Sequence, residues 1–181
     1  MTNYGCKDYW NKRYTESGDD ASFEWLESYQ TLQDILAQFF THKDIKILML
    51  GSGNADFSAD IYDEGYHNIT NVDFSEVVIE QMIQKNAELR PKMVWLMLDV
   101  TEMSRFVVDT FDLVIDKSTI DCLFCREDHV VKVAKMMMDI QRILKPGGTY
   151  FLISTGQPKN RASHFVRKFL SWDRKEYVLH D

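Results

Sequence analysis

The amino-acid sequence predicts a doubly wound α/β fold, in which helices cover both faces of a mostly parallel sheet. Short apolar segments alternate with segments of helical periodicity along the chain, which is the pattern of a parallel sheet buried on both sides. A glycine turn, Gly51-Ser52-Gly53-Asn54, follows the first of the apolar segments. The 181 residues, 45% of them hydrophobic, are enough for one domain, 1–181, with one sizeable core.

The first half of the chain predicts helices and strands in alternation. An apolar stripe of helical spacing marks the first helix, and Ser75 is a suitable N-cap for the third. Arg90-Pro91 ends that third helix, because the residue before a proline disfavours helical geometry. The predicted elements in this half are helix 29–40, an apolar strand within 43–50, helix 57–63, strand 68–73 and helix 76–89.

The second half continues the alternation. Lys145-Pro146-Gly147-Gly148 predicts the end of a long amphipathic helix, because proline and glycine interrupt helices. The predicted elements here are strands 93–98 and 111–115, helix 128–144, strand 149–154, helix 162–172 and a last strand 174–180.

Charge and targeting signals narrow the function classes. With 21 basic and 28 acidic residues, the net charge of −7 disfavours non-specific nucleic-acid binding. The first ten residues show no secretory signal, and no apolar run approaches the ~20 residues needed to cross a membrane. We therefore expect a cytoplasmic protein without a nucleic-acid or membrane partner; the oligomeric state is left open.

The three cysteines predict neither a disulfide framework nor a metal site. Cys122 and Cys125 form a Cys-x-x-Cys pair followed by His129, but a structural zinc ion requires four ligands and no second pair is present. Cys6 makes the number of cysteines odd. The prediction is therefore three free thiols, with Cys122 and Cys125 buried, and no bound metal.

After the first predicted strand and its glycine turn, each of the following three predicted strands ends at or just before an aspartate: Asp73, Asp99 and Asp116. The carboxyl ends of parallel strands meet at one edge of the sheet, which is where ligands bind in doubly wound folds. Asp73 lies 22 residues after Gly51, a spacing suited to hydrogen bonds with ribose hydroxyls. The alternative is that these aspartates only cap turns and helices. Asp56 occupies the place of the third glycine of a dinucleotide-binding turn, which disfavours NAD and favours S-adenosylmethionine, a ligand without phosphate.

The order of the segments GSGN, NVDFS, LDV, DLVIDKSTID and ILKPGGTYFLIS resembles the class I S-adenosylmethionine-dependent methyltransferases. The segments DYWNKRY, GSGNADFS and DKSTIDCL are similar to the group that methylates lysine on translation elongation factor 1-alpha. The resemblance spans about residues 4–155. It implies a Rossmann-like three-layer fold, S-adenosylmethionine as cofactor, S-adenosylhomocysteine as product and an elongation factor as protein substrate. The family sheet has seven strands, and only six are predicted here, so we expect the last strand to be lacking.

The same resemblance implies roles for individual residues. The glycine turn with Gly51 and Gly53 would meet the amino-acid end of the cofactor, and Lys117 would contact the cofactor as well. Serines replace two family residues, a cysteine at Ser52 and a glycine at Ser118. The other cofactor-binding residues implied are Asp73 for the ribose, Phe74, Asp99 and Val100 for the adenine, and Trp10, Tyr14 and Trp25 in a covering segment, 1–28.

The remaining expectations concern catalysis. Transfer of a methyl group to an amine requires orientation and a dry pocket, and Asp116 and Asp121 are the candidates for orienting the amine. The alternative is that Asp121 caps the following helix. Without the resemblance, the N-terminal aromatic residues would be interpreted as core. We expect a cofactor-binding core, 29–155, and a C-terminal helix and strand, 156–181. The alternative functions are methylation of a small molecule or another protein, and a non-catalytic cofactor-binding scaffold.

Overall fold

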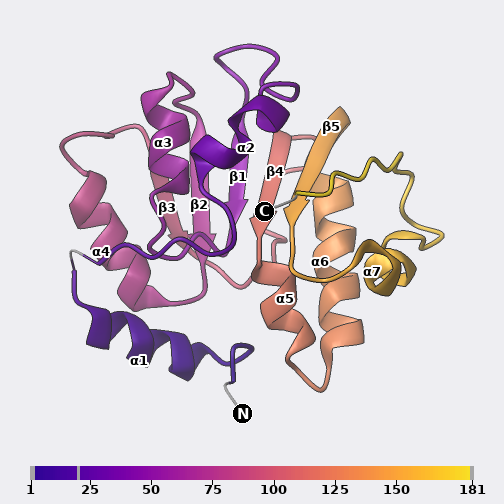
Figure 1. Cartoon of the computed structure of the whole chain (residues 1–181), viewed down its shortest axis with the longest axis horizontal. Helices are drawn as coiled ribbons and strands as arrows, with labels where there is room; N and C mark the ends of the chain where they lie inside the picture. Colours follow the sequence, from indigo (N-terminus) through magenta and orange to yellow (C-terminus); the bar gives the residue numbers. More distant parts are fainter. Residues whose placement is uncertain (1–2, 20, 180–181) are drawn as a thin grey trace.

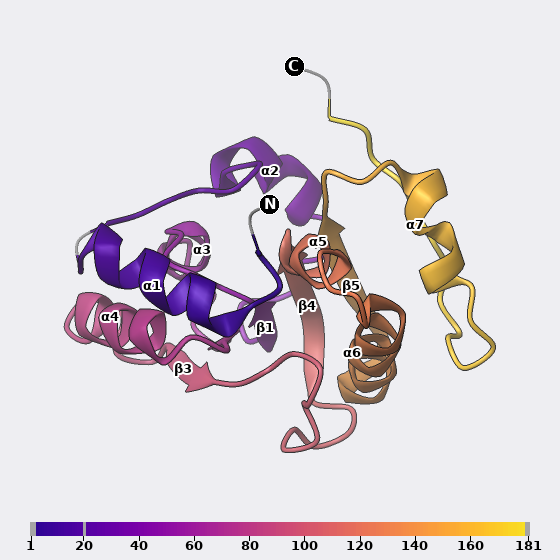
Figure 2. The ribbon, with the colours of Figure 1, turned by 90° about the horizontal axis from the view of Figure 1, so that it is seen from below.

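The structure is a computed structural model that describes residues 3–19 and 21–179. Its centre is a five-stranded sheet with the strand order β3-β2-β1-β4-β5, in which all neighbouring strands are parallel (Figures 1 and 2). The strands are β1 (Ile47–Leu50), β2 (Ile69–Asp73), β3 (Val94–Met97), β4 (Phe111–Lys117) and β5 (Leu144–Ile153). The doubly wound α/β prediction is confirmed.

Two layers of helices cover the sheet. Residues of β1 alternate between two cores, because successive side chains of a strand point to opposite faces. Ile47 and Met49 belong to the core shared with the first four helices, and Leu48 and Leu50 to the core shared with α5 and α6. The helices are α1 (Lys7–Ser17), α2 (Tyr29–Leu36), α3 (Phe57–Asp63), α4 (Glu76–Asn86), α5 (Thr119–Phe124), α6 (His129–Ile143) and α7 (Pro158–Phe165).

The direction in which the chain builds the sheet changes between β1 and β4. The chain runs outward from β1 through β2 to β3, then returns to place β4 on the other side of β1. Leu50 pairs with Asp116, so the carboxyl ends of β1 and β4 lie next to each other. Such a switch point leaves a crevice outside the strand ends, where ligands bind in this architecture.

Ser75 is the N-cap of α4, as predicted: its Oγ accepts a hydrogen bond from the Val78 backbone N–H at 3.4 Å. Two helices are shorter than predicted. α2 ends at Leu36 and α4 at Asn86, whose side chain donates to the Met82 carbonyl at 2.9 Å. A side chain that bonds to the backbone in this way competes with continuation of the helix. The strand predicted at 149–154 begins at Leu144, immediately after α6.

The C-terminal predictions were wrong in two places. α7 covers Pro158–Phe165 instead of 162–172, because Pro158 fits the first turn of a helix, where no N–H is required. The predicted strand 174–180 is not formed: residues 174–179 contain neither helix nor strand, and residue 180 lies outside the described residues. The apolar residues of this segment are largely exposed, Val178 to 68%, so no packed face selects an extended, paired conformation.

Within the described ranges, the structure has no helix that is both long enough and apolar enough to cross a membrane.

Candidate functional site

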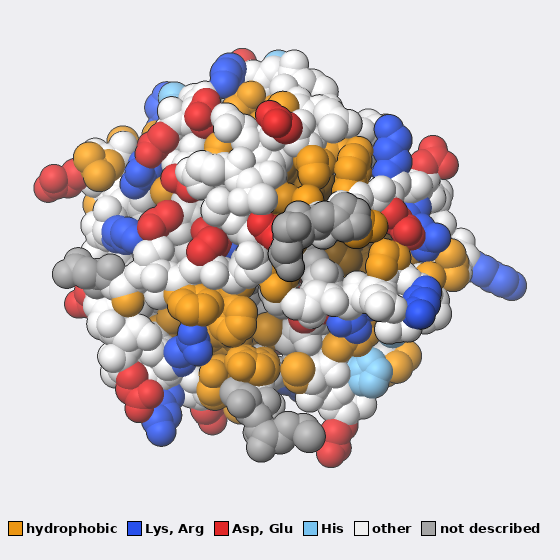
Figure 3. Space-filling model, in the orientation of Figure 1, with side chains coloured by type: hydrophobic (Ala, Val, Ile, Leu, Met, Phe, Trp, Pro, Cys, Tyr) orange, Lys and Arg blue, Asp and Glu red, His pale blue; other side chains and the backbone are white. Residues whose placement is uncertain are grey.

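A cavity of about 800 Å³ opens at the carboxyl ends of the strands. Hydrophobic side chains gather in the middle of the lower half of the face in Figure 3, the region between α1 and α5 in Figure 1. Apart from Asp116, all the residues predicted for the site line this cavity: Trp10, Tyr14, Trp25, Gly51, Gly53, Asp73, Phe74, Asp99, Val100, Lys117 and Asp121. The structure therefore brings together residues from the N-terminal segment and from four strand ends.

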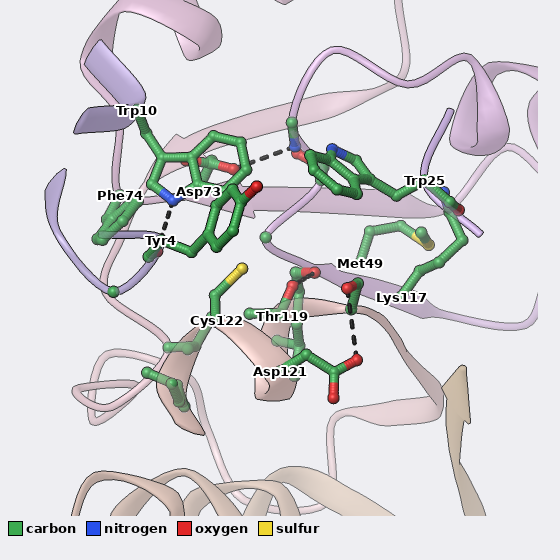
Figure 4. A pocket seen from close by; sticks show the side chains of 18 of the residues that line it. Tyr4, Trp10, Trp25, Met49, Asp73, Phe74, Lys117, Thr119, Asp121 and Cys122 are labelled. Atoms are coloured by element: carbon green, nitrogen blue, oxygen red, sulfur yellow. Dashed lines mark hydrogen bonds between the residues drawn. The ribbon is translucent and has the colours of Figure 1, made fainter. Parts of the chain in front are cut away.

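Asp73 lies at the end of β2 beneath the glycine turn (Figure 4). Its Oδ2 accepts a hydrogen bond from the Gly53 N–H at 3.1 Å, and its Oδ1 accepts one from the Ser75 N–H at 2.9 Å. Burial raises the pKa of this carboxyl to about 6, although the backbone hydrogen bonds oppose the increase. Asp73 thus combines a fixed orientation with a pKa near neutrality.

The glycine turn is positioned by close contacts on both of its sides. Gly51 and Gly53 have φ angles of +56° and +55°, in the left-handed region that favours glycine. A Cβ on Gly51 would lie 2.2 Å from Thr119 Oγ1, and one on Gly53 would lie 2.9 Å from the Tyr14 hydroxyl. The Thr119 hydroxyl also donates to the Leu50 carbonyl at 2.8 Å. Thr119 therefore connects the start of α5 to the end of β1.

Ser118 stands where the resembling family has glycine, and its backbone is left-handed, with φ +67° and ψ +3°. This conformation directs the chain from β4 into α5, and the Ser118 N–H donates to the Ile153 carbonyl at 2.9 Å. A non-glycine residue adopts it at a cost of about 1–2 kcal/mol.

We predict that Ser118→Gly raises the free energy of unfolding by about 0.5–1 kcal/mol, because the strain is removed while the greater freedom of glycine in the unfolded chain offsets part of the gain. Urea denaturation of both proteins measures the difference. Ser118→Ala is the matched control: it keeps the strain and loses the Ser118 hydroxyl, which bonds to Asp121 at 3.4 Å, so it should not stabilise the protein. A glycine variant less stable than the native protein would contradict the prediction.

Asp116 does not face the cavity. Its side chain is fully buried, and Oδ1 accepts the N–H groups of Thr119 at 2.8 Å and Ile120 at 3.2 Å. Oδ2 accepts the Tyr150 hydroxyl at 2.9 Å. Burial raises the pKa of Asp116 to about 7, against the effect of these hydrogen bonds. The carboxylate thus supports the first turn of α5 and does not lie at the mouth of the cavity, which corrects the prediction from the sequence.

The wall after β3 is formed by Asp99 and Val100. Asp99 Oδ1 accepts hydrogen bonds from the Thr101 N–H at 2.8 Å and the Thr101 hydroxyl at 2.7 Å, which fixes the turn. Val100 is buried, and Phe74, half-buried at the end of β2, lines the same cavity. An apolar slot with a carboxylate at its edge suits a flat heterocycle that carries N–H donors.

Aromatic residues of the N-terminal segment form the opposite wall. Trp10 and Tyr14 on α1 are stacked with ring centroids 5.6 Å apart, and the Trp10 indole N–H donates to the Tyr4 carbonyl at 2.7 Å. Trp25 packs edge-on against Trp10 at 6.1 Å, and the Arg13 guanidinium lies 5.3 Å from the centroid of Trp25. Burial raises the pKa of Tyr14 far above its ordinary value, so its hydroxyl stays protonated. Trp10, Tyr14 and Trp25 therefore pack in the hydrophobic core and also form part of the cavity wall.

Lys117, at the end of β4, reaches the segment that follows α1. Its ammonium forms an ion pair with Glu24 and donates to the Trp25 carbonyl at 2.9 Å. Burial lowers the pKa of Lys117 and raises that of Glu24, and their mutual hydrogen bond opposes both changes. The pair holds the segment that follows α1 against the end of β4.

Asp121, on α5, connects three elements around the cavity. Its Oδ1 accepts hydrogen bonds from the Ser154 hydroxyl at 2.7 Å and from the Arg161 guanidinium at 2.6 Å. Its Oδ2 accepts the Thr155 N–H at 3.2 Å. Figure 4 shows Asp121 beside Thr119 on α5, across the cavity from Trp10 and Trp25. Of the two aspartates predicted to orient an amine, Asp121 is the one that lines the cavity.

The cysteines are free, as predicted, but they are not all buried. Cys6 and Cys122 are half-buried and Cys125 is exposed, because it lies at the C-terminal end of the short helix α5. Cys122 lines the cavity, and burial raises its pKa to about 12. Among the described residues, no group of three or more His, Cys, Asp or Glu side chains could hold a metal ion.

Several residues of the site were missed in the sequence analysis. Thr119 lies within the DKSTID segment, two residues after Lys117, and this position indicates that it belongs to the site. Glu24 and Arg161 are separated from their partners by 93 and 40 residues, and no local pattern identifies such pairs.

Residues 41–176 match a protein family described as "Methyltransferase domain". The chain is 38% identical over 170 residues to the Mus musculus protein named "eEF1A lysine and N-terminal methyltransferase"; the match covers 91% of the chain and 24% of that relative. It is also 30% identical to the Bos taurus "EEF1A lysine methyltransferase 4", covering 91% of the chain and 66% of the relative. The chain thus spans about a quarter of the length of the first of these relatives.

Solved structures share the fold. A Haloferax volcanii protein, a putative methyltransferase in complex with the activator Trm112, superposes with a TM-score of 0.60 at 20% identity, covering 96% of the chain and 68% of that protein. The glycopeptide N-methyltransferase MtfA, solved with sinefungin, has a TM-score of 0.56 at 17% identity. The match covers 74% of the chain and 56% of MtfA. At these identities the likeness concerns the fold alone.

Proposed function

The chain belongs to the class I S-adenosylmethionine-dependent methyltransferases, and on this premise we propose that it methylates a lysine side chain of a protein, with translation elongation factor 1-alpha as the substrate. The names of the relatives support the choice of a protein lysine as acceptor. The proposed partner would place the protein in the cytoplasm.

The observation that carries the proposal is the arrangement of Asp73 beneath the glycine turn. A carboxylate has about four acceptor positions, and Asp73 uses one on each oxygen, for Gly53 and Ser75. Capacity therefore remains for the two hydroxyls of a ribose. The cavity volume of about 800 Å³ is also in the range of small-molecule sites. These features fit S-adenosylmethionine.

The other cavity residues would hold the remaining parts of the cofactor. Phe74 and Val100 would pack on the adenine, with Asp99 at its edge. The turn at Gly51 and Gly53 would meet the amino-acid end, where Lys117, positioned by Glu24, offers a cation for a carboxylate. Trp10, Tyr14 and Trp25 would cover the bound molecule and exclude water.

When bound, S-adenosylmethionine would supply an activated methyl group on a positively charged sulfur, with a neutral thioether as the leaving group. The chain's own contribution is orientation and removal of water. A lysine amine has a pKa of about 10.4 in water and must lose a proton to solvent before it can react. Asp121, which lines the cavity, would orient that amine, and Asp116 would act behind it as a positioning residue for Thr119.

Calorimetric titration with S-adenosylmethionine, S-adenosylhomocysteine and NAD tests the cofactor. We expect binding of the first two and no heat from NAD. Incubation of elongation factor 1-alpha with the chain and methyl-labelled cofactor then tests the acceptor, with label expected on lysine. Cofactor binding without transfer to any protein would indicate a scaffold or a small-molecule enzyme, and absence of cofactor binding would overturn the proposal.

A further inference from the structure

A cationic side chain of the protein itself occupies one corner of the cavity. The Arg161 guanidinium donates to Asp121 Oδ1 at 2.6 Å, and its central carbon lies 3.9 Å from the centroid of the Phe124 ring. On its other side it lies against Gly156, where a Cβ would come within 2.2 Å of Arg161 Nε. Both Asp121 and Arg161 line the cavity. We call the corner formed by Asp121, Phe124 and Ser154 the cation corner.

The chemistry of the cation corner suits an alkylammonium group. A carboxylate supplies the opposite charge and an aromatic face adds cation–π attraction, while the Ser154 hydroxyl fixes the carboxylate from behind at 2.7 Å. The side chains of Arg161 and Asp121 are 19% and 14% exposed, so water screens the pair only partly.

Arg161 fits the cation corner incompletely. Its Nε is buried and has no hydrogen-bond partner among the described residues. A buried donor without a partner lowers the stability of the arrangement that buries it. An alkylammonium group has no N–H along its aliphatic stem. It would bind the same carboxylate and ring without burying a donor that lacks a partner.

The helix that carries Arg161 is held by half-buried contacts, among them Phe165 against the core and His164 beside Phe124. α7 has eight residues, none of them buried, and it lies at the periphery of the molecule beside α6 (Figure 2). Elements with few buried contacts open at low free-energy cost. Withdrawal of Arg161 from the cavity would therefore break no hydrogen bond between strands of the sheet.

We propose that the cation corner is the subsite for the acceptor's lysine side chain, and that Arg161 occupies it as an internal stand-in until the acceptor displaces it. This assignment rests on the proposed function and adds to it the residues that recognise the acceptor. Asp121 and Phe124 select a cation, and Arg161 keeps the corner closed in the absence of acceptor.

Binding of n-butylammonium, which has the length and charge of a lysine side chain, tests the assignment without any cofactor. We expect Arg161→Ala to bind n-butylammonium about tenfold more tightly than the native protein in a calorimetric or NMR titration. Adding Asp121→Asn to this variant should abolish the gain, and adding Phe124→Leu should reduce it several-fold.

Two controls separate charge recognition from a simple opening of the cavity. Lys159→Ala removes a cation of the same helix that is exposed and does not line the cavity, so it should behave as the native protein. n-Butanol is uncharged, so it should bind Arg161→Ala no more tightly than it binds the double variant Arg161→Ala with Asp121→Asn.

The outcomes distinguish this proposal from the proposed function. An Arg161→Ala variant that keeps its thermal unfolding profile but binds n-butylammonium no more tightly than the native protein overturns the subsite. A gain that survives Asp121→Asn does the same. S-adenosylhomocysteine binding is measured separately, and its absence overturns the proposed function. The n-butylammonium titration contains no cofactor, so it still shows whether the corner binds a cation.

Discussion

Replacing Asp73 with alanine is expected to weaken S-adenosylmethionine binding by about 100-fold or more, because two charge-assisted hydrogen bonds to the ribose are lost together. The same change removes the acceptor for the Gly53 and Ser75 N–H groups, so the glycine turn loses its support as well. Calorimetric titration measures the affinity. Asp112→Ala is the matched control, since Asp112 is bonded to Lys46 and Lys145 and does not line the cavity.

The pH dependence gives this prediction a second readout. In the folded protein without cofactor the pKa of Asp73 is about 6, above the ordinary 3.8, because the carboxyl is buried. Ribose hydroxyls donate to the ionised form, so affinity should rise as pH increases through about 6 and should fall about tenfold per pH unit below it. In Asp73→Asn this dependence should disappear. Affinity that is unchanged in Asp73→Ala would refute the assignment of the ribose.

The second large effect is expected at Gly51. Gly51→Ala should lower the free energy of unfolding by about 3 kcal/mol, because the added Cβ would meet Thr119 Oγ1 at 2.2 Å in a backbone that is already left-handed. Gly147→Ala separates the two causes: Gly147 has φ +79° and no atom within 4 Å of the added Cβ. That variant should lose only about 1 kcal/mol, the cost of the backbone conformation alone.

Urea denaturation of the two variants measures these differences. Adding Thr119→Ala to Gly51→Ala should recover part of the loss, since it removes the hydroxyl nearest to the new methyl group. Equal losses in Gly51→Ala and Gly147→Ala would show that backbone strain, and not contact with α5, makes glycine necessary at the turn.

The two aspartates of the DKSTID segment show where sequence patterns stop being informative. Asp116 and Asp121 are five positions apart and were assigned the same role. The left-handed Ser118 between them turns the chain, so that Asp116 lies beneath α5 against Tyr150 while Asp121 lines the cavity. Asp116 is on β4 and Asp121 is on α5, so the two carboxylates of one short segment have different surroundings.

The sequence by itself determined the five strands in their order, the helices α2, α3, α4 and α6, the glycine turn and the residues Asp73 and Asp99, because these depend on periodicity and on spacing along a few consecutive residues. The helices α1 and α5 were not predicted. Only the tertiary structure decided that Lys117 forms an ion pair with Glu24 and that Arg161 forms one with Asp121. It also decided that residues 174–179 form no strand. The reason is physical: these outcomes depend on which distant surfaces the chain brings together, and neither local propensity nor a motif encodes the partner of a side chain 40 or 93 residues away.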